Sequence, residues 1–139
     1  MLVVMDTDVI VAALRSPSGA SAALLRMVRA GDLNLAASIS LFTEYEAVCL
    51  RPEHGEVAGL SVRQVGTFLD MLASLVKPVV VHFNWRPQLR DPGDEMVLEA
   101  AINAQADVLL TFNQKHFASA VSRFGLKLAL PGPFLRSLQ

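Results

Sequence analysis

The sequence predicts a single three-layer α/β/α domain, in which a mostly parallel sheet of about four to five strands lies between helices. Short apolar runs without alternation recur along the chain, which is typical of strands buried on both faces. Stretches with helical spacing lie between these runs, as in parallel βαβ units. No linker divides the 139 residues, so we expect residues 1–139 to form one domain.

The N-terminal third of the chain contains two predicted strand–helix steps. Residues 2–5, LVVM, are the first predicted strand, and residues 9–14 a short helix that ends at the turn sequence SPSG. Apolar residues over 20–28 recur at helical spacing, and Gly31 is a stop signal for that helix. Residues 33–37 are the second predicted strand.

Two helices and a third strand are predicted in the middle of the chain. The first helix spans residues 40–50, with Ser40 as N-cap, and RPEHG at 51–55 breaks it. A second amphipathic helix occupies residues 61–76 and ends at Lys77-Pro78. Residues 79–81 are the third predicted strand.

The C-terminal third contributes a helix and two more predicted strands. The helix begins at Asp94, which we expect to be its N-cap. Residues 107–111 are the fourth predicted strand. Residues 126–130 are a fifth, before PGP at 131–133.

Composition limits the classes of function. The formal net charge is −1, so the chain lacks the global positive charge that marks many nucleic-acid binders, although a local patch stays open. The single cysteine, Cys49, excludes a disulfide framework and fits a reducing cytoplasmic setting, and we expect it to be a buried apolar side chain. No apolar run approaches the roughly 20 residues that span a bilayer, and we expect no signal peptide.

Two carboxylates follow the first predicted strand in LVVMDTDV. Functional sites in open parallel sheets form outside the carboxyl ends of the strands, which is where Asp6 falls. One of Asp6 and Asp8 is expected to cap the next helix, and two caps are not needed. We therefore predict that Asp6 belongs to a site, with Asp8 as a cap or a supporting acid.

Glu44 is unusual because it shares helical spacing with apolar residues in SLFTEYEAVCL. Its neighbours at this spacing are Leu41, Tyr45 and Val48, so we expect the carboxylate on the inward face of the helix. A buried carboxylate needs a partner, which is either a structural salt bridge or a site group. Glu46 is expected to be a solvated surface residue.

Further polar residues fall near the same edge of the predicted sheet. Asp91 belongs to a DPG turn, and Asp94 lies at a helix N-terminus. Thr111 and Asn113 follow the fourth strand, where an Asx-turn is the structural alternative for Asn113. Clustered carboxylates repel one another unless cations neutralise them. Hard oxygen ligands without thiolates favour Mg²⁺ or Mn²⁺ over zinc.

The chain resembles the PIN domain family over nearly its whole length, through four segments: VVMDTDVIVAAL, SLFTEYEAV, DPGDEMVLEAA and ADVLLTFNQKHF. The resemblance implies a parallel sheet flanked by helices and a metal-dependent nuclease that acts on RNA. It also implies the toxin of a prokaryotic toxin–antitoxin pair, with an antitoxin protein as partner and a homodimer as assembly. Phosphodiester hydrolysis by metal-activated water is the implied reaction.

The resemblance assigns roles position by position. Its four catalytic positions fall on Asp6, Glu44, Asp94 and Asn113. Asp6, Glu44 and Asp94 are implied metal ligands, with Asp91 as a further candidate. The family often has Asp at position 113 and Asn at position 8, so both residues depart from its pattern. The implied supporting residues, which orient ligands or water, are Thr7, Asp8 and Thr111.

Substrate contacts are not legible from the sequence. One or two phosphate contacts are expected among the basic residues near the site edge, which are Arg15, Arg51, Arg90, Lys115 and His116. Two interpretations of Trp85 stay open: a core residue, or a surface on which a base stacks.

Two alternatives to the nuclease stay open. With Asn113 in place of an acid, the domain could bind RNA or an antitoxin without cleavage. The DxD sequence at the strand end is also similar to haloacid-dehalogenase-like phosphatases. The absence of a lysine in the expected context and the limited length disfavour that class.

Overall fold

The computed structural model describes residues 1–82 and 88–139, so Trp85 lies outside the described residues. The strands are β1 (Leu2–Met5), β2 (Asn34–Ala37), β3 (Lys77–Pro78), β4 (Val108–Leu110) and β5 (Leu128–Ala129). The helices are α1 (Thr7–Arg15), α2 (Ala20–Ala30), α3 (Ile39–Cys49), α4 (Pro52–Ala58), α5 (Val62–Leu75), α6 (Pro92–Ala104), the 3₁₀ helix η1 (Gln114–Phe117), α7 (Ala118–Phe124) and α8 (Pro131–Ser137).

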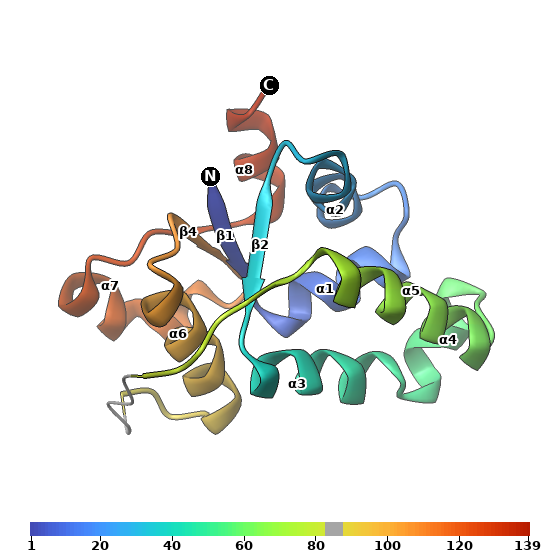
Figure 1. Ribbon diagram of the computed structural model, residues 1–139, viewed down its shortest axis with the longest axis horizontal. Coiled ribbons are helices and arrows are strands. Elements are labelled where there is room, and N and C mark those ends of the chain that lie inside the picture. The colour runs from blue at the N-terminus through green and yellow to red at the C-terminus, as the bar shows by residue number, and fades with distance from the viewer. Residues whose placement is uncertain (83–87) are drawn as a thin grey trace.

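All strand pairs are parallel, and the order across the sheet is β3-β2-β1-β4-β5. The predicted three-layer α/β/α domain with five strands is therefore confirmed. In Figure 1 both termini lie at one end of the molecule, and β1 and β2 run away from it. The carboxyl ends of these strands face the region of α1, α3 and α6.

Strand β1 is central because its residues are apolar on both faces. Val3, Val4 and Met5 are fully buried, and Met5 is in register with Leu110 of β4. Strand β2 pairs with one side of β1, and β4 pairs with the other. The strand order therefore reverses at β1, and the crevice between the ends of β1 and β4 is the usual ligand site in such sheets.

The third strand is displaced from the predicted position. Residues 79–81 were expected to form it, but Lys77 and Pro78 pair with Ala36 and Ala37 instead. Pairing ends there because β2 ends at Ala37, whose carbonyl accepts one last bond from the Val79 N–H. Proline is tolerated at this place because β3 is an edge strand.

Four helical segments were not predicted from the sequence: α4, η1, α7 and α8. RPEHG does end α3, as predicted, but Pro52 then opens α4 instead of a loop. Pro131 likewise opens α8, in the PGP sequence that follows the fifth predicted strand. Proline fits the first helical turn, where its missing N–H has no acceptor, so both prolines were usable start signals.

Candidate active site

Asp6 occupies the switch point of the sheet. Its backbone N–H donates to the Leu110 carbonyl at 2.9 Å, so the residue sits between the ends of β1 and β4. Its side chain is only 6% exposed. One carboxylate oxygen accepts the Thr7 N–H at 2.7 Å and caps α1, and the other accepts the Thr111 hydroxyl at 2.7 Å. Asp6 is therefore both the helix cap and the best-placed site carboxylate.

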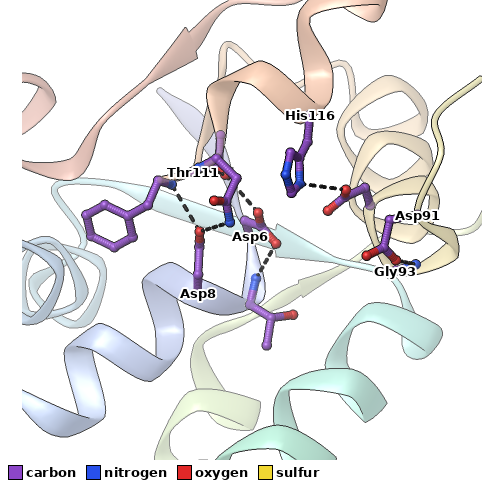
Figure 2. A network of polar contacts seen from close by, with 10 residues as sticks. Asp6, Asp8, Asp91, Gly93, Thr111 and His116 are labelled. Carbon is purple, nitrogen blue, oxygen red and sulfur yellow. Dashed lines mark hydrogen bonds and ion pairs between the residues drawn. The ribbon is translucent and has the colours of Figure 1, made fainter.

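Asp8 is not the cap of α1, which corrects one of the two roles expected for it. It lies in the first turn and reaches across to the segment after β4. There one oxygen accepts the Phe112 N–H at 3.2 Å and the Asn113 side-chain N–H at 2.9 Å. Its other oxygen is buried and has no hydrogen-bond partner among the described residues. Figure 2 shows Asp8 facing the same space as Asp6.

Thr111 and Asn113 hold the segment after β4 in place. The Thr111 hydroxyl donates to Asp6 and accepts the Asn113 N–H at 2.9 Å, so the turn is made by threonine and not by an Asx-turn. Asn113 itself is exposed and directs its amide N–H to Asp8. Thr7 contacts Asp6 through its backbone, and its hydroxyl makes no hydrogen bond within the described residues.

The N-terminus of α6 supplies two more carboxylates. Asp91, not Asp94, is the N-cap, because its side chain accepts the Gly93 N–H at 2.7 Å and the helix begins at Pro92. The expected cap role of Asp94 is therefore wrong. Asp94 lies in the first turn, where its carboxylate contacts Nδ1 of His116 at 3.0 Å. Figure 2 shows His116 on the opposite side of Asp6 from Asp8.

Glu44 lies at the edge of the buried stripe of α3. The buried positions of this helix are Leu41, Tyr45 and Cys49, and Glu44 is half-buried beside them, so its expected place on the inward face is only partly right. It makes no hydrogen bond or ion pair within the described residues. Tyr45, one residue on, donates its hydroxyl to the Met5 carbonyl at the end of β1. Helix α3 also packs against both α1 and α6. Glu46 is exposed, as predicted.

The electrostatics of these groups show that they share one space. Burial, followed by the charge of Asp6, raises the pKa of Asp8 to about 7. Burial also raises the pKa of Asp6, against the hydrogen bonds from Thr111 and Thr7 that lower it. The pKa of Asp94 is raised by burial and then by Asp6 and Asp91. The three aspartates therefore repel one another when ionised.

The donor set fits a hard divalent cation by its chemistry. Carboxylate oxygens predominate, and the unpartnered oxygen of Asp8 is a free ligand atom beside Asp6. In the described residues, no three His, Cys, Asp or Glu side chains already converge on one point at coordination distance. The structure thus brings Asp6, Asp8, Asp91 and Asp94 to one edge of the sheet without completing a coordination shell.

Glu95 is a residue that no sequence pattern singled out, and it shapes the site indirectly. Its side chain is 4% exposed and accepts the N–H groups of Gln88 and Leu89 at 2.6 and 2.7 Å. Cys49 is fully buried, as predicted, and burial raises its thiol pKa to about 11. Among the five basic residues considered, Arg90, Lys115 and His116 line a cavity with Asp91 and Asp94, whereas Arg15 and Arg51 do not.

Comparisons with known proteins agree with this architecture. A family model described as "PIN domain" matches residues 2–115. Among solved structures, the chain is similar to one in a crystal structure of VapBC2 from Rickettsia felis bound to a DNA fragment from their promoter. The TM-score is 0.60 with 18% identity, and the match covers 94% of this chain and 98% of that one. Such an identity establishes likeness of fold alone. None of the curated proteins matches significantly.

Proposed function

Because the chain belongs to the PIN domain family, we propose that it is a metal-dependent endoribonuclease and the toxin of a toxin–antitoxin pair. Family membership also leaves the phosphatase alternative without support. One observation carries the proposal: Asp6 lies at the switch point of the sheet, and after burial its charge is the next largest cause of the raised pKa of both Asp8 and Asp94. The likeness to a chain of the VapBC2 complex supports the toxin–antitoxin part.

In the proposed reaction, water hydrolyses an RNA phosphodiester. Asp6, Asp94 and Glu44 would hold Mg²⁺ or Mn²⁺, with Asp91 as a further ligand. When bound, such a cation lowers the pKa of a coordinated water and stabilises negative charge on phosphate oxygens. Thr111 holds one oxygen of Asp6, and the Thr7 N–H holds the other, so the carboxylate keeps its direction before substrate binds.

The supporting residues have separate tasks in this proposal. Asp8 ties the segment after β4 to α1 and adds the negative charge that Asn113 lacks. Asn113 fixes Asp8 through its amide N–H, and its carbonyl oxygen stays available as a neutral ligand. His116 contacts Asp94 and limits the directions that this carboxylate takes. The proposed reaction needs no side-chain nucleophile, so the buried Cys49 has no part in it.

A catalytically degenerate binding module is the second candidate. It is favoured by the position of Asn113, which supplies no charge, and by the incomplete convergence of acidic groups in the described residues. Such a module would bind RNA or the antitoxin without turnover. We propose a homodimer for either case, and light scattering of the purified chain tests it.

The test is cleavage of end-labelled RNA with added Mg²⁺ or Mn²⁺, using protein free of antitoxin. Wild type should cleave, Asp6→Asn should not, and the exposed control Asp70→Asn should behave as wild type. Glu44→Gln should lose activity while Glu46→Gln, on the same helix, keeps it. Equal cleavage by wild type and Asp6→Asn would indicate a contaminant. A folded wild type that binds RNA but never cleaves it supports the binding module.

A further inference from the structure

A cavity of about 730 Å³ opens beside Asp94. It lies between the segment Gln88–Asp91, the first turn of α6 and the region of η1 that carries Lys115 and His116. Its volume is within the range of roughly 300–1,000 Å³ that is typical of small-molecule sites. Asp94 belongs both to the carboxylate edge and to the cavity lining, so the cavity adjoins the candidate site.

The wall formed by residues 88–91 is held in place by protein contacts. The buried carboxylate of Glu95 accepts two consecutive N–H groups, from Gln88 and Leu89. The guanidinium of Arg123 on α7 donates to the side-chain oxygen of Gln88 at 2.5 Å and so ties the wall to the opposite side of the cavity. A cavity fixed in this way is preorganised, and little ordering is required when a ligand enters.

Charge is distributed unevenly around the cavity. Asp91 and Asp94 line it at the start of α6, with the His116 side chain directed to Asp94. Arg90 and Lys115 are exposed on the lining, and neither pairs with a carboxylate among residues 1–82 and 88–139. Two cations that form no ion pair within the described part of the chain, next to a proposed phosphodiesterase centre, suit the phosphate groups that flank the cleaved bond.

We infer that this cavity is a subsite for one unpaired nucleotide next to the scissile phosphate, with Arg90 and Lys115 as its phosphate contacts. The inference rests on the proposed function for its choice of ligand. A base that enters between the wall of residues 88–91 and the η1 region is splayed out of any duplex. RNA bound here is therefore single-stranded at the cleavage position.

Binding of a fluorescent single-stranded oligoribonucleotide tests the inference. Fluorescence anisotropy is measured in EDTA, so that metal-dependent cleavage does not interfere, over a series of salt concentrations. Each of Arg90→Ala and Lys115→Ala should weaken binding about fivefold near 0.1 M salt. Each should also reduce the salt slope by about 0.7, the value for one phosphate contact on a single strand. Arg15→Ala is the matched control, because Arg15 ends α1 roughly 13 Å from Asp6 and is not on the cavity lining.

The outcomes separate this inference from the proposed function. Wild-type binding that neither variant weakens, or that Arg15→Ala weakens equally, overturns the subsite. The subsite is also overturned if binding of a fully paired duplex depends equally on Arg90 and Lys115, or if the wild type binds no RNA at any salt concentration. If the wild type cleaves RNA with Mg²⁺ but Arg90→Ala and Lys115→Ala bind RNA normally, the nuclease proposal is supported and the subsite is overturned. If both variants bind RNA more weakly but the wild type never cleaves it, the subsite is supported and the nuclease proposal is contradicted.

Discussion

The hydroxyl of Thr111 donates a 2.7 Å hydrogen bond to the buried carboxylate of Asp6, 105 residues earlier in the chain. This bond joins the carboxyl ends of two adjacent parallel strands, β1 and β4, at the point where the strand order reverses. It fixes one oxygen of Asp6 while the Thr7 N–H fixes the other. The direction of the central carboxylate is therefore set by the fold itself.

Replacing Thr111 by valine removes that donor at nearly constant volume. We expect Thr111→Val to lower the free energy of unfolding by about 1–3 kcal/mol, because a buried acceptor loses its partner. Urea denaturation measures the change. In an Asp6→Ala background the same substitution should cost clearly less, because the acceptor is already absent. An equal cost in both backgrounds would show that the bond contributes nothing to stability.

The metal-free protein should become less stable as pH rises. The pKa of Asp8 is raised from 3.8 to about 7, so the folded state binds its proton more tightly than the unfolded chain does. The contribution of Asp8 to the free energy of unfolding is fully present below the unfolded pKa near 4. It is lost as pH rises through the folded pKa near 7. Urea unfolding in EDTA at pH 5 and pH 8 should show a lower midpoint at pH 8.

Asp8→Asn should shrink this difference between pH 5 and pH 8, since the group no longer titrates. Asp70→Asn, on the exposed side of α5, should leave the difference unchanged. A pH dependence that is the same in Asp8→Asn and wild type would contradict the assignment to Asp8.

Mg²⁺ or Mn²⁺ should stabilise the wild type, because it neutralises the mutual repulsion of Asp6, Asp8 and Asp94. At ten times the dissociation constant the gain is about 1.4 kcal/mol, visible as a rise of the melting temperature. Asp6→Asn should show little or no rise. The metal response of this variant is compared with its own metal-free stability, because asparagine removes the repulsion between carboxylates but also one of the two oxygens that accept hydrogen bonds from Thr7 and Thr111. Equal metal responses would argue that Asp6 is not a ligand.

Cys49 should resist alkylation in the native protein. Its side chain is fully buried and burial raises its pKa to about 11, so the reactive thiolate is scarce at neutral pH. Iodoacetamide at pH 8 should label it slowly in buffer and rapidly in concentrated urea, as mass spectrometry can follow. Rapid labelling in buffer would mean that α3 opens readily.

Local patterns determined much of this protein without any knowledge of the fold. The unbroken apolar run at residues 2–5 indicated a strand buried on both faces, and its end at Asp6 indicated the site edge. Helical spacing located α2, α3 and α5 closely, because one buried face imposes a period on the sequence. The resemblance to a family singled out the aspartates of the candidate site. These features can be predicted from the sequence because each depends on neighbouring residues within one helix or strand.

Contacts between distant residues were decided only by the tertiary structure. Asp6 caps α1 although Asp8 was an equal candidate by residue type, because Asp8 is held by Phe112 and Asn113 across the crevice. Asp91 instead of Asp94 begins α6, and Asp94 turns to His116. One wall of the cavity beside Asp94 is held by Glu95, which accepts two N–H groups of the segment before α6. Such partners are brought together by strand order and packing, which a linear spacing of residues does not encode.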